Sequence, residues 1–141
     1  MAEKEILEAL QKAVTSAVAA SIKSTLPVKY VGRTFTKPNS GGWLEVIYIP
    51  NNVTDEFWST GKTYQGILRL VLHWIMDDKG AYEPIRVIES IADYFAKGTK
   101  FNDPSNAVTV KISDNPNLIN AIEEAPEMLF PLSVRYHFFK T

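Results

Sequence analysis

The chain of 141 residues contains no cysteine. This absence excludes disulfides, thiolate zinc sites and a cysteine nucleophile. It fits the reducing environment of a cytoplasm. The length fits one domain, and a domain of this size buries roughly 70% of the surface that its unfolded chain exposes. We therefore expect a fold that is held together by its hydrophobic core.

Long hydrophobic runs are also absent, and no segment approaches the roughly 18 apolar residues that a membrane span requires. Residues 13–20 (AVTSAVAA) could be mistaken for the core of a signal peptide. Three glutamates precede them in place of a basic stretch, and Thr15 and Ser16 interrupt them. We expect a protein that is made and kept soluble, with no membrane partner.

The chain has almost no net charge, because Lys+Arg 15 and Asp+Glu 16 give −1. This balance excludes a strong attraction of the whole chain to nucleic acid or anionic lipid. The charges are nevertheless segregated, since residues 103–127 carry acids with a single base and bases predominate in residues 23–69. Two solvated faces would explain this pattern. Complementary contacts between neighbouring subunits, or acids that line a channel and let DNA slide, are the alternatives.

Apolar periodicity predicts two helices. In the first, residues 3–24, apolar side chains recur every four residues from Ile6 to Ile22, and Pro27 ends the segment. The second begins near Pro84 and stops before Gly98.

Alternating apolar residues predict strands, of which residues 64–76 and 128–138 are the longest. Residues 116–125 fit either a short helix or a loop. The order of helix, strands, helix and strands lacks regular βαβ alternation. It predicts a single α+β domain over residues 1–141, with an antiparallel or mixed sheet and a second helix within residues 28–139, and both helices on one face of the sheet.

The period-two pattern in the long strands also predicts which sheet face is buried. The expected apolar face is Leu68, Leu70, Leu72, Trp74, Leu132, Val134 and Tyr136, with Ile88, Ile91 and Phe95 packed over it.

No motif assembles a catalytic, cofactor or metal site. Residues 61–63 (GKT) resemble the end of a phosphate-binding loop, but they precede a strand, and Glu56 stands where that loop needs glycine. His73 and His137 have no third zinc ligand nearby in the sequence. No serine lies in a Gly-x-Ser-x-Gly elbow. We therefore expect no enzyme activity, no cofactor and no bound metal.

Phe57 and Trp58 are two large rings in an otherwise polar loop, residues 51–63. They can fold back as a small cluster beneath the loop, or they can protrude and be covered by a partner, where tryptophan often carries much of the binding energy. Together with the segregated charges they are our candidates for a contact with another subunit or a tube. The candidate interface residues are Phe57, Trp58, Lys29, Arg33, Lys37, Glu123, Glu124 and Glu127.

An ordered series of short structural segments runs along the chain. They are residues 43–46 (WLEV), 48–51 (YIPN), 65–66 (QG), Gly80, 95–99 (FAKGT), 108–112 (VTVKI) before Pro116, and 130–136 (FPLSVRY). In this order they resemble the tail terminator family of siphophages, the lambda-type proteins, over nearly the whole chain. These are scaffold residues, so the resemblance transfers no functional site.

The resemblance implies a homohexameric ring that ends tail-tube polymerisation and offers a joining surface to the head. The implied partners are further copies of the chain, the tail tube protein and a head-completion or connector protein, while double-stranded DNA passes through the ring without specific binding. The implied location is the head-proximal end of the virion tail, after assembly in the host cytoplasm. Two other classes stay open: a cellular oligomeric binding module, which would need a concave apolar pocket, and a small enzyme with a dispersed site.

Overall fold

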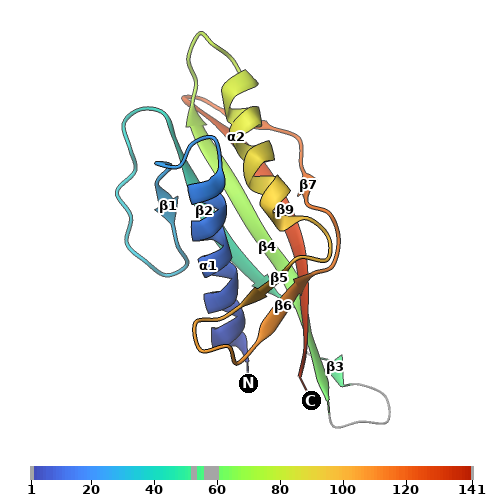
Figure 1. Cartoon of the computed structure of the whole chain (residues 1–141). Helices are drawn as coiled ribbons and strands as arrows, with labels where there is room; N and C mark the ends of the chain where they lie inside the picture. Colours follow the sequence, from blue (N-terminus) through green and yellow to red (C-terminus); the bar gives the residue numbers. More distant parts are fainter. Residues whose placement is uncertain (1, 52–53, 56–60, 141) are drawn as a thin grey trace.

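The computed structural model describes residues 2–51, 54–55 and 61–140. Within this part of the chain, two α-helices lie across one face of a curled, mixed sheet (Figure 1). Helix α1 spans Glu3–Ala20, and helix α2 spans Tyr82–Ala92 and continues into a 3-10 turn, η1, at Asp93–Phe95. The strands are β1 (Val28–Lys29), β2 (Gly42–Pro50), β3 (Thr54–Asp55), β4 (Lys62–Ile75), β5 (Lys100–Asn102), β6 (Thr109–Ile112), β7 (Asn117–Leu118), β8 (Ile122–Glu124) and β9 (Glu127–Lys140). This arrangement confirms the predicted α+β fold.

The two longest strands, β4 and β9, pair along their whole length and form the centre of the sheet. Their antiparallel register runs from Lys62 opposite Lys140 to Ile75 opposite Glu127. The strand order is β1-β2-β4-β9-β6-β5, and β3 pairs with β4 while β7 and β8 pair with β9. The β1–β2 pair is parallel and makes the sheet mixed.

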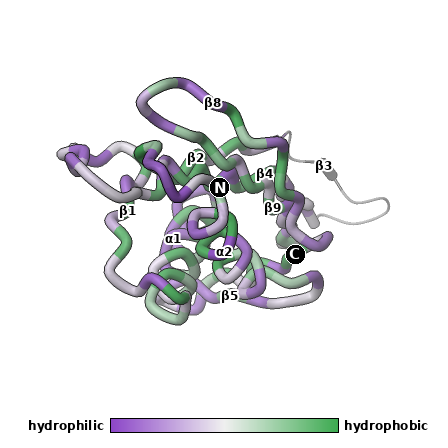
Figure 2. The backbone as a smooth tube through the Cα atoms, turned by 90° about the horizontal axis from the view of Figure 1, so that it is seen from above, coloured by the Kyte–Doolittle hydropathy of each residue, from purple (hydrophilic) through white to green (hydrophobic). Residues whose placement is uncertain are grey.

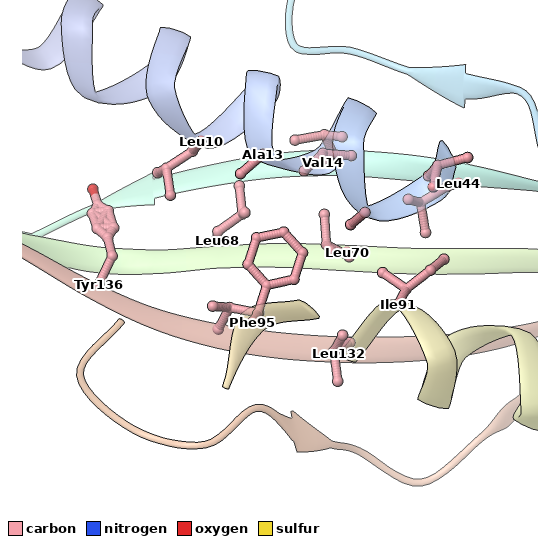
Figure 3. Close-up of a cluster of buried hydrophobic side chains, with 14 of the residues drawn as sticks. Leu10, Ala13, Val14, Leu44, Leu68, Leu70, Ile91, Phe95, Leu132 and Tyr136 are labelled. Atoms are coloured by element: carbon pink, nitrogen blue, oxygen red, sulfur yellow. The ribbon is translucent and has the colours of Figure 1, made fainter. Parts of the chain in front are cut away.

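The predicted apolar sheet face is confirmed. All seven of its strand residues and all three helical residues predicted to cover it are buried in one hydrophobic cluster. Figure 3 shows Phe95 and Ile91 beside Leu70 and Leu132 of the central strands. Helix α1 covers the rest of this face with a stripe that includes Leu10. Every second side chain along a strand points to the same face of the sheet. Apolar residues at every second position therefore identified the buried face.

The first helix is shorter than predicted, since it ends at Ala20 and not at residue 24. Ser21 adopts an extended backbone and its hydroxyl donates to the carbonyl of Val18 at 2.7 Å. The same hydroxyl oxygen accepts the backbone N–H of Lys23 at 3.2 Å. A serine side chain that satisfies backbone groups in this way competes with helix continuation.

Two segments without a predicted strand turned out to be extended. Residues 116–125, which fit a short helix or a loop, hold β7 and β8 along β9, with Leu118 opposite Leu132 and Ile122 opposite Leu129. Strand β5 pairs with β6. Both segments are too short to show a period of their own, and pairing with a long neighbour satisfies their backbone groups.

Gly66 of β4 lies where three strands approach closely, opposite both Pro50 and Tyr136. A Cβ atom at this position would lie 2.5 Å from the carbonyl oxygen of Ile49 and 2.6 Å from the hydroxyl oxygen of Tyr136. We expect Gly66→Ala to lower the free energy of unfolding by about 1–3 kcal/mol, the usual cost of overpacking. Urea denaturation of the two purified chains measures the difference.

The matched control is Gln65→Ala, one position earlier on the same strand, where the side chain is exposed. It should change the free energy of unfolding by less than about 0.5 kcal/mol. A Gly66→Ala chain as stable as the Gln65→Ala chain would contradict the close approach at Gly66.

Candidate interaction surfaces

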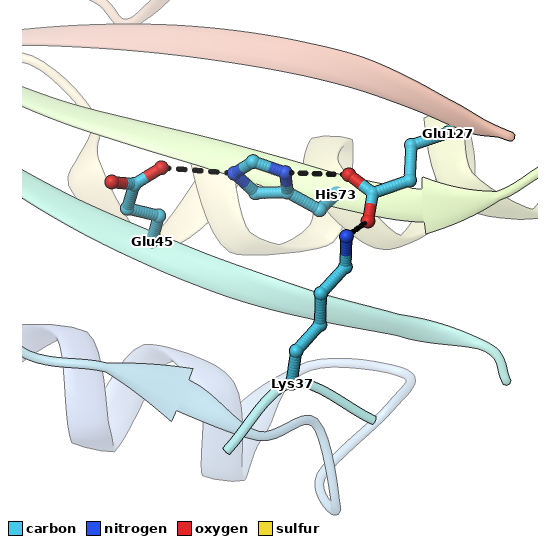
Figure 4. A network of polar contacts seen from close by, with 4 residues as sticks. All are labelled: Lys37, Glu45, His73 and Glu127. Atoms are coloured by element: carbon cyan, nitrogen blue, oxygen red, sulfur yellow. Dashed lines mark hydrogen bonds and ion pairs between the residues drawn. The ribbon is translucent and has the colours of Figure 1, made fainter. Parts of the chain in front are cut away.

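A row of polar side chains crosses the sheet face opposite the helices. His73 lies between two carboxylates, with Nε2 at 2.9 Å from Oε1 of Glu45 and Nδ1 at 3.2 Å from Oε2 of Glu127 (Figure 4). The Nζ of Lys37 pairs with the other oxygen of Glu127. The Trp43 ring stacks on the His73 ring at a centroid distance of 3.8 Å. We call Lys37, Glu45, His73 and Glu127 the polar row.

The polar row attaches the loop before β2 to the sheet. Lys37 belongs to that loop, whereas Glu127 opens β9, two strands beyond β2. Glu127 is buried, with 9% of its surface exposed, and a buried carboxylate is costly unless it is paired and hydrogen-bonded. Both ring nitrogens of His73 already contact a carboxylate, so this arrangement holds a loop in place and offers no free base.

Burial by itself would raise the pKa of Glu127, but Lys37 and His73 outweigh it and hold the pKa below its ordinary value of 4.5. A carboxyl group whose pKa is lower in the folded chain stabilises the fold fully above its unfolded pKa, and this stabilisation is lost as the pH falls through the folded pKa. We therefore expect the gap in unfolding free energy between the wild type and Glu127→Gln to be largest near neutral pH and to narrow on acidification. Urea denaturation at a series of falling pH values measures the gap.

Asp78→Asn is the control, because the Asp78 side chain is exposed and no ion pair joins it to another described residue. The difference in unfolding free energy between this control and the wild type should be small at every pH. A Glu127→Gln gap that stays constant down to acid pH would contradict a role for the lowered pKa.

The acidic stretch of residues 103–127 divides into buried and exposed groups. Asp103 is 1% exposed; its carboxylate accepts hydrogen bonds from the Ser105 side chain and from the backbone N–H of Val108, the latter at 2.9 Å. The Ser105 and Val108 bonds hold the pKa of Asp103 below its ordinary value. Asp103 thus shapes the turn before β6, and Glu127 belongs to the polar row. Asp114, Glu123 and Glu124 remain at the surface.

The basic candidates divide in the same way. Lys37 pairs with Glu127 of its own chain, so the structure brings together within one molecule two residues that we had considered for a contact between subunits. Lys29 lies half-buried on β1, and the exposed Arg33 stands 5.5 Å from the centre of the Tyr30 ring. Phe57 and Trp58 lie outside the described residues, so their prediction stays open.

An apolar edge escaped the sequence reasoning. Every residue from 117 to 126 is exposed, and three of them are large aliphatic side chains: Leu118 at 39%, Ile119 at 37% and Ile122 at 45%. The available signal was a segment between Pro116 and Pro126 that holds three large aliphatic residues.

Metal and phosphate chemistry find no support in the described part of the chain. It holds no group of three or more His, Asp or Glu side chains that could bind a metal ion. His137 contacts the Ser113 hydroxyl at 2.7 Å, far along β9 from the point where β9 passes His73. Lys62 and Thr63 open β4, so the Gly-Lys-Thr triplet leads into a strand and not into a helix. No described helix is long and apolar enough to cross a membrane.

Comparison with known proteins places this fold among phage tail proteins. A family described as phage tail terminator protein matches residues 5–136. One solved structure aligns with a TM-score of 0.79, covers 98% of this chain and 96% of its own, and is 17% identical in sequence. At that identity it shows a shared fold and no more. No curated protein matches the chain significantly.

Proposed function

The chain belongs to the phage tail terminator family, and on this premise we propose that it forms a homohexameric ring that ends tail-tube polymerisation and provides the head-joining surface. The family is one of structural proteins, so the protein has a structural role in the phage tail. The match over residues 5–136 carries the proposal, because it omits only the start of the first helix and the end of the last strand.

The proposal includes three kinds of partner and no catalytic step. Copies of the chain form the ring, the tail tube protein binds one face, and a head-completion or connector protein binds the other. Double-stranded DNA passes through without specific binding, in keeping with a net charge of −1. The ring sits at the head-proximal end of the virion tail after assembly in the host cytoplasm.

The test is to size the purified protein by light scattering and to image it by electron microscopy, alone and with its tail tube protein. The proposal expects six-fold rings, free or seated on one end of the tube. It also expects that adding the protein to polymerising tube protein stops further growth. A chain that forms no ring under either condition, and leaves tube growth unchanged, would overturn the proposal.

A further inference from the structure

We propose that neighbouring copies of this chain join through opposite edges of the sheet, the basic edge of one copy against the acidic edge of the next. The basic edge is Lys29, Val31 and Arg33, on and just after β1. The acidic edge is Leu118, Ile119, Ile122, Glu123 and Glu124, on and between β7 and β8. This inference rests on the proposed ring and names the surfaces that would build it.

The two edges lie at the same level of the sheet. Lys29 is opposite Glu45, Glu45 is opposite Val71, and Val71 is opposite Pro131. The backbone N–H of Ile119 then donates to the carbonyl of Pro131 at 2.9 Å. Four strand spacings of about 4.8 Å separate the edges by roughly 19 Å along the sheet.

The strand order puts these edges on opposite sides of the central strands, with β1 on the left and β7 on the right in Figure 1. Figure 2 shows that β1 and β8 project from different sides of the molecule. Within the described residues, no strand pairs with the outer side of β1, β7 or β8. Different surfaces on different sides are what a head-to-tail contact requires, and such contacts close into rings when the rotation between copies allows it.

The acidic edge has the composition of a surface that another chain covers. Its three aliphatic side chains are each more than a third exposed, at 39%, 37% and 45%. An exposed, apolar sheet edge is a template for pairing with another chain, and lysine is a common guard against this. No Lys or Arg occurs between Lys111 and Arg135. Glu123 and Glu124 are thus the charges on the edge that carries these aliphatic side chains, and protein interfaces combine apolar and charged groups in this way.

The basic edge complements the acidic edge, because it carries an exposed aliphatic side chain and charges of the opposite sign. Val31 is 37% exposed and stands between Lys29 and Arg33. In the described part of the chain, no ion pair engages either base or either of Glu123 and Glu124. A symmetric contact would place two identical edges together, and like charges would repel each other. A contact between the basic edge of one copy and the acidic edge of the next pairs opposite charges. A second copy of this chain is therefore the occupant that fits.

The test uses two variants with reversed edges: Glu123→Lys/Glu124→Lys and Lys29→Glu/Arg33→Glu. Each alone sets like charges against each other at every contact, so we expect the concentration for half-maximal ring assembly to rise at least about tenfold. An equimolar mixture of the two restores opposite charges at every contact of an alternating ring. It should assemble near the wild-type concentration, and the defect of each variant alone should ease at high salt. Light scattering measures assembly as a function of protein concentration and salt, and electron microscopy shows whether the assemblies are rings.

Asp78→Lys/Glu83→Lys is the control, since it makes the same charge change at two exposed acids that belong to neither edge, and it should leave assembly unchanged. Circular dichroism melts verify that all variants fold. If both edge variants assemble alone as the wild type does, or if their mixture stays unassembled, this contact is wrong and the ring proposal stands. The Glu123→Lys/Glu124→Lys variant could also form normal rings but change tube capping or DNA passage. That result would assign the two acids to the tube or the channel, and it would overturn the proposed contact between copies. A wild-type chain that forms no ring, alone or on the tube, overturns the proposed function and the contact together.

Discussion

A Leu70→Ala substitution is expected to lower the free energy of unfolding by about 2–5 kcal/mol, the range for removing a buried leucine side chain from a packed core. Leu70 is fully buried in the central strand, opposite Val46 of β2 on one side and Leu132 of β9 on the other. Figure 3 shows it beneath the helices, within the cluster that contains Ile91. The strands on both sides restrain the backbone, so the surroundings cannot collapse into the space left by the side chain. Urea denaturation measures the change.

Ile22→Ala is the matched control, because it truncates an aliphatic side chain that is 55% exposed. We expect it to change the free energy of unfolding by less than about 0.5 kcal/mol. A Leu70→Ala chain that loses no more than this control would contradict the assignment of the buried face.

Phe95→Ala is expected to cost about 3–5 kcal/mol of unfolding free energy, the range for removing a buried aromatic ring. Phe95 is fully buried in η1, where the chain leaves α2 and turns toward β5. Its ring centre lies 5.5 Å from that of Phe101 and 5.9 Å from that of Tyr94. Loss of the ring removes buried area and the contacts of this aromatic group, which links the second helix to the far end of the sheet. Thermal and urea denaturation both measure the loss.

Phe95→Leu serves as the comparison, since leucine keeps much of the apolar volume and should cost clearly less than alanine. Equal losses from the two substitutions would point to a requirement for the ring itself. A loss below about 0.5 kcal/mol from Phe95→Ala is a surface-like effect and would refute the packing described here.

The sequence by itself determined the fold class, the layer order and the buried face. The alternating residues of β4 and β9 extend over 14 residues each, long enough for period two to identify the side that faces the helices. The spacing of Ile6, Leu10 and Val14 likewise identified the buried side of α1. These are local signals, because which face a side chain occupies depends on the backbone geometry of its own segment.

Only the tertiary structure decided which polar residues meet. His73 and Glu127 are 54 positions apart and join only because β4 and β9 pair in one register. Lys37 reaches Glu127 only because its loop folds over the sheet. The sequence placed Lys37 and Glu127 in opposite charge groups, yet it could not show that they satisfy each other within one chain.

The same limit applies to the short segments. Residues 117–118 and 122–124 are extended because β9 offers them backbone partners. The burial of Asp103 follows from the turn that it shares with Ser105 and Val108. Periodicity shows where a long element turns its apolar side. Pairing between distant residues depends on strand register and loop path, and both are set by the packed chain as a whole.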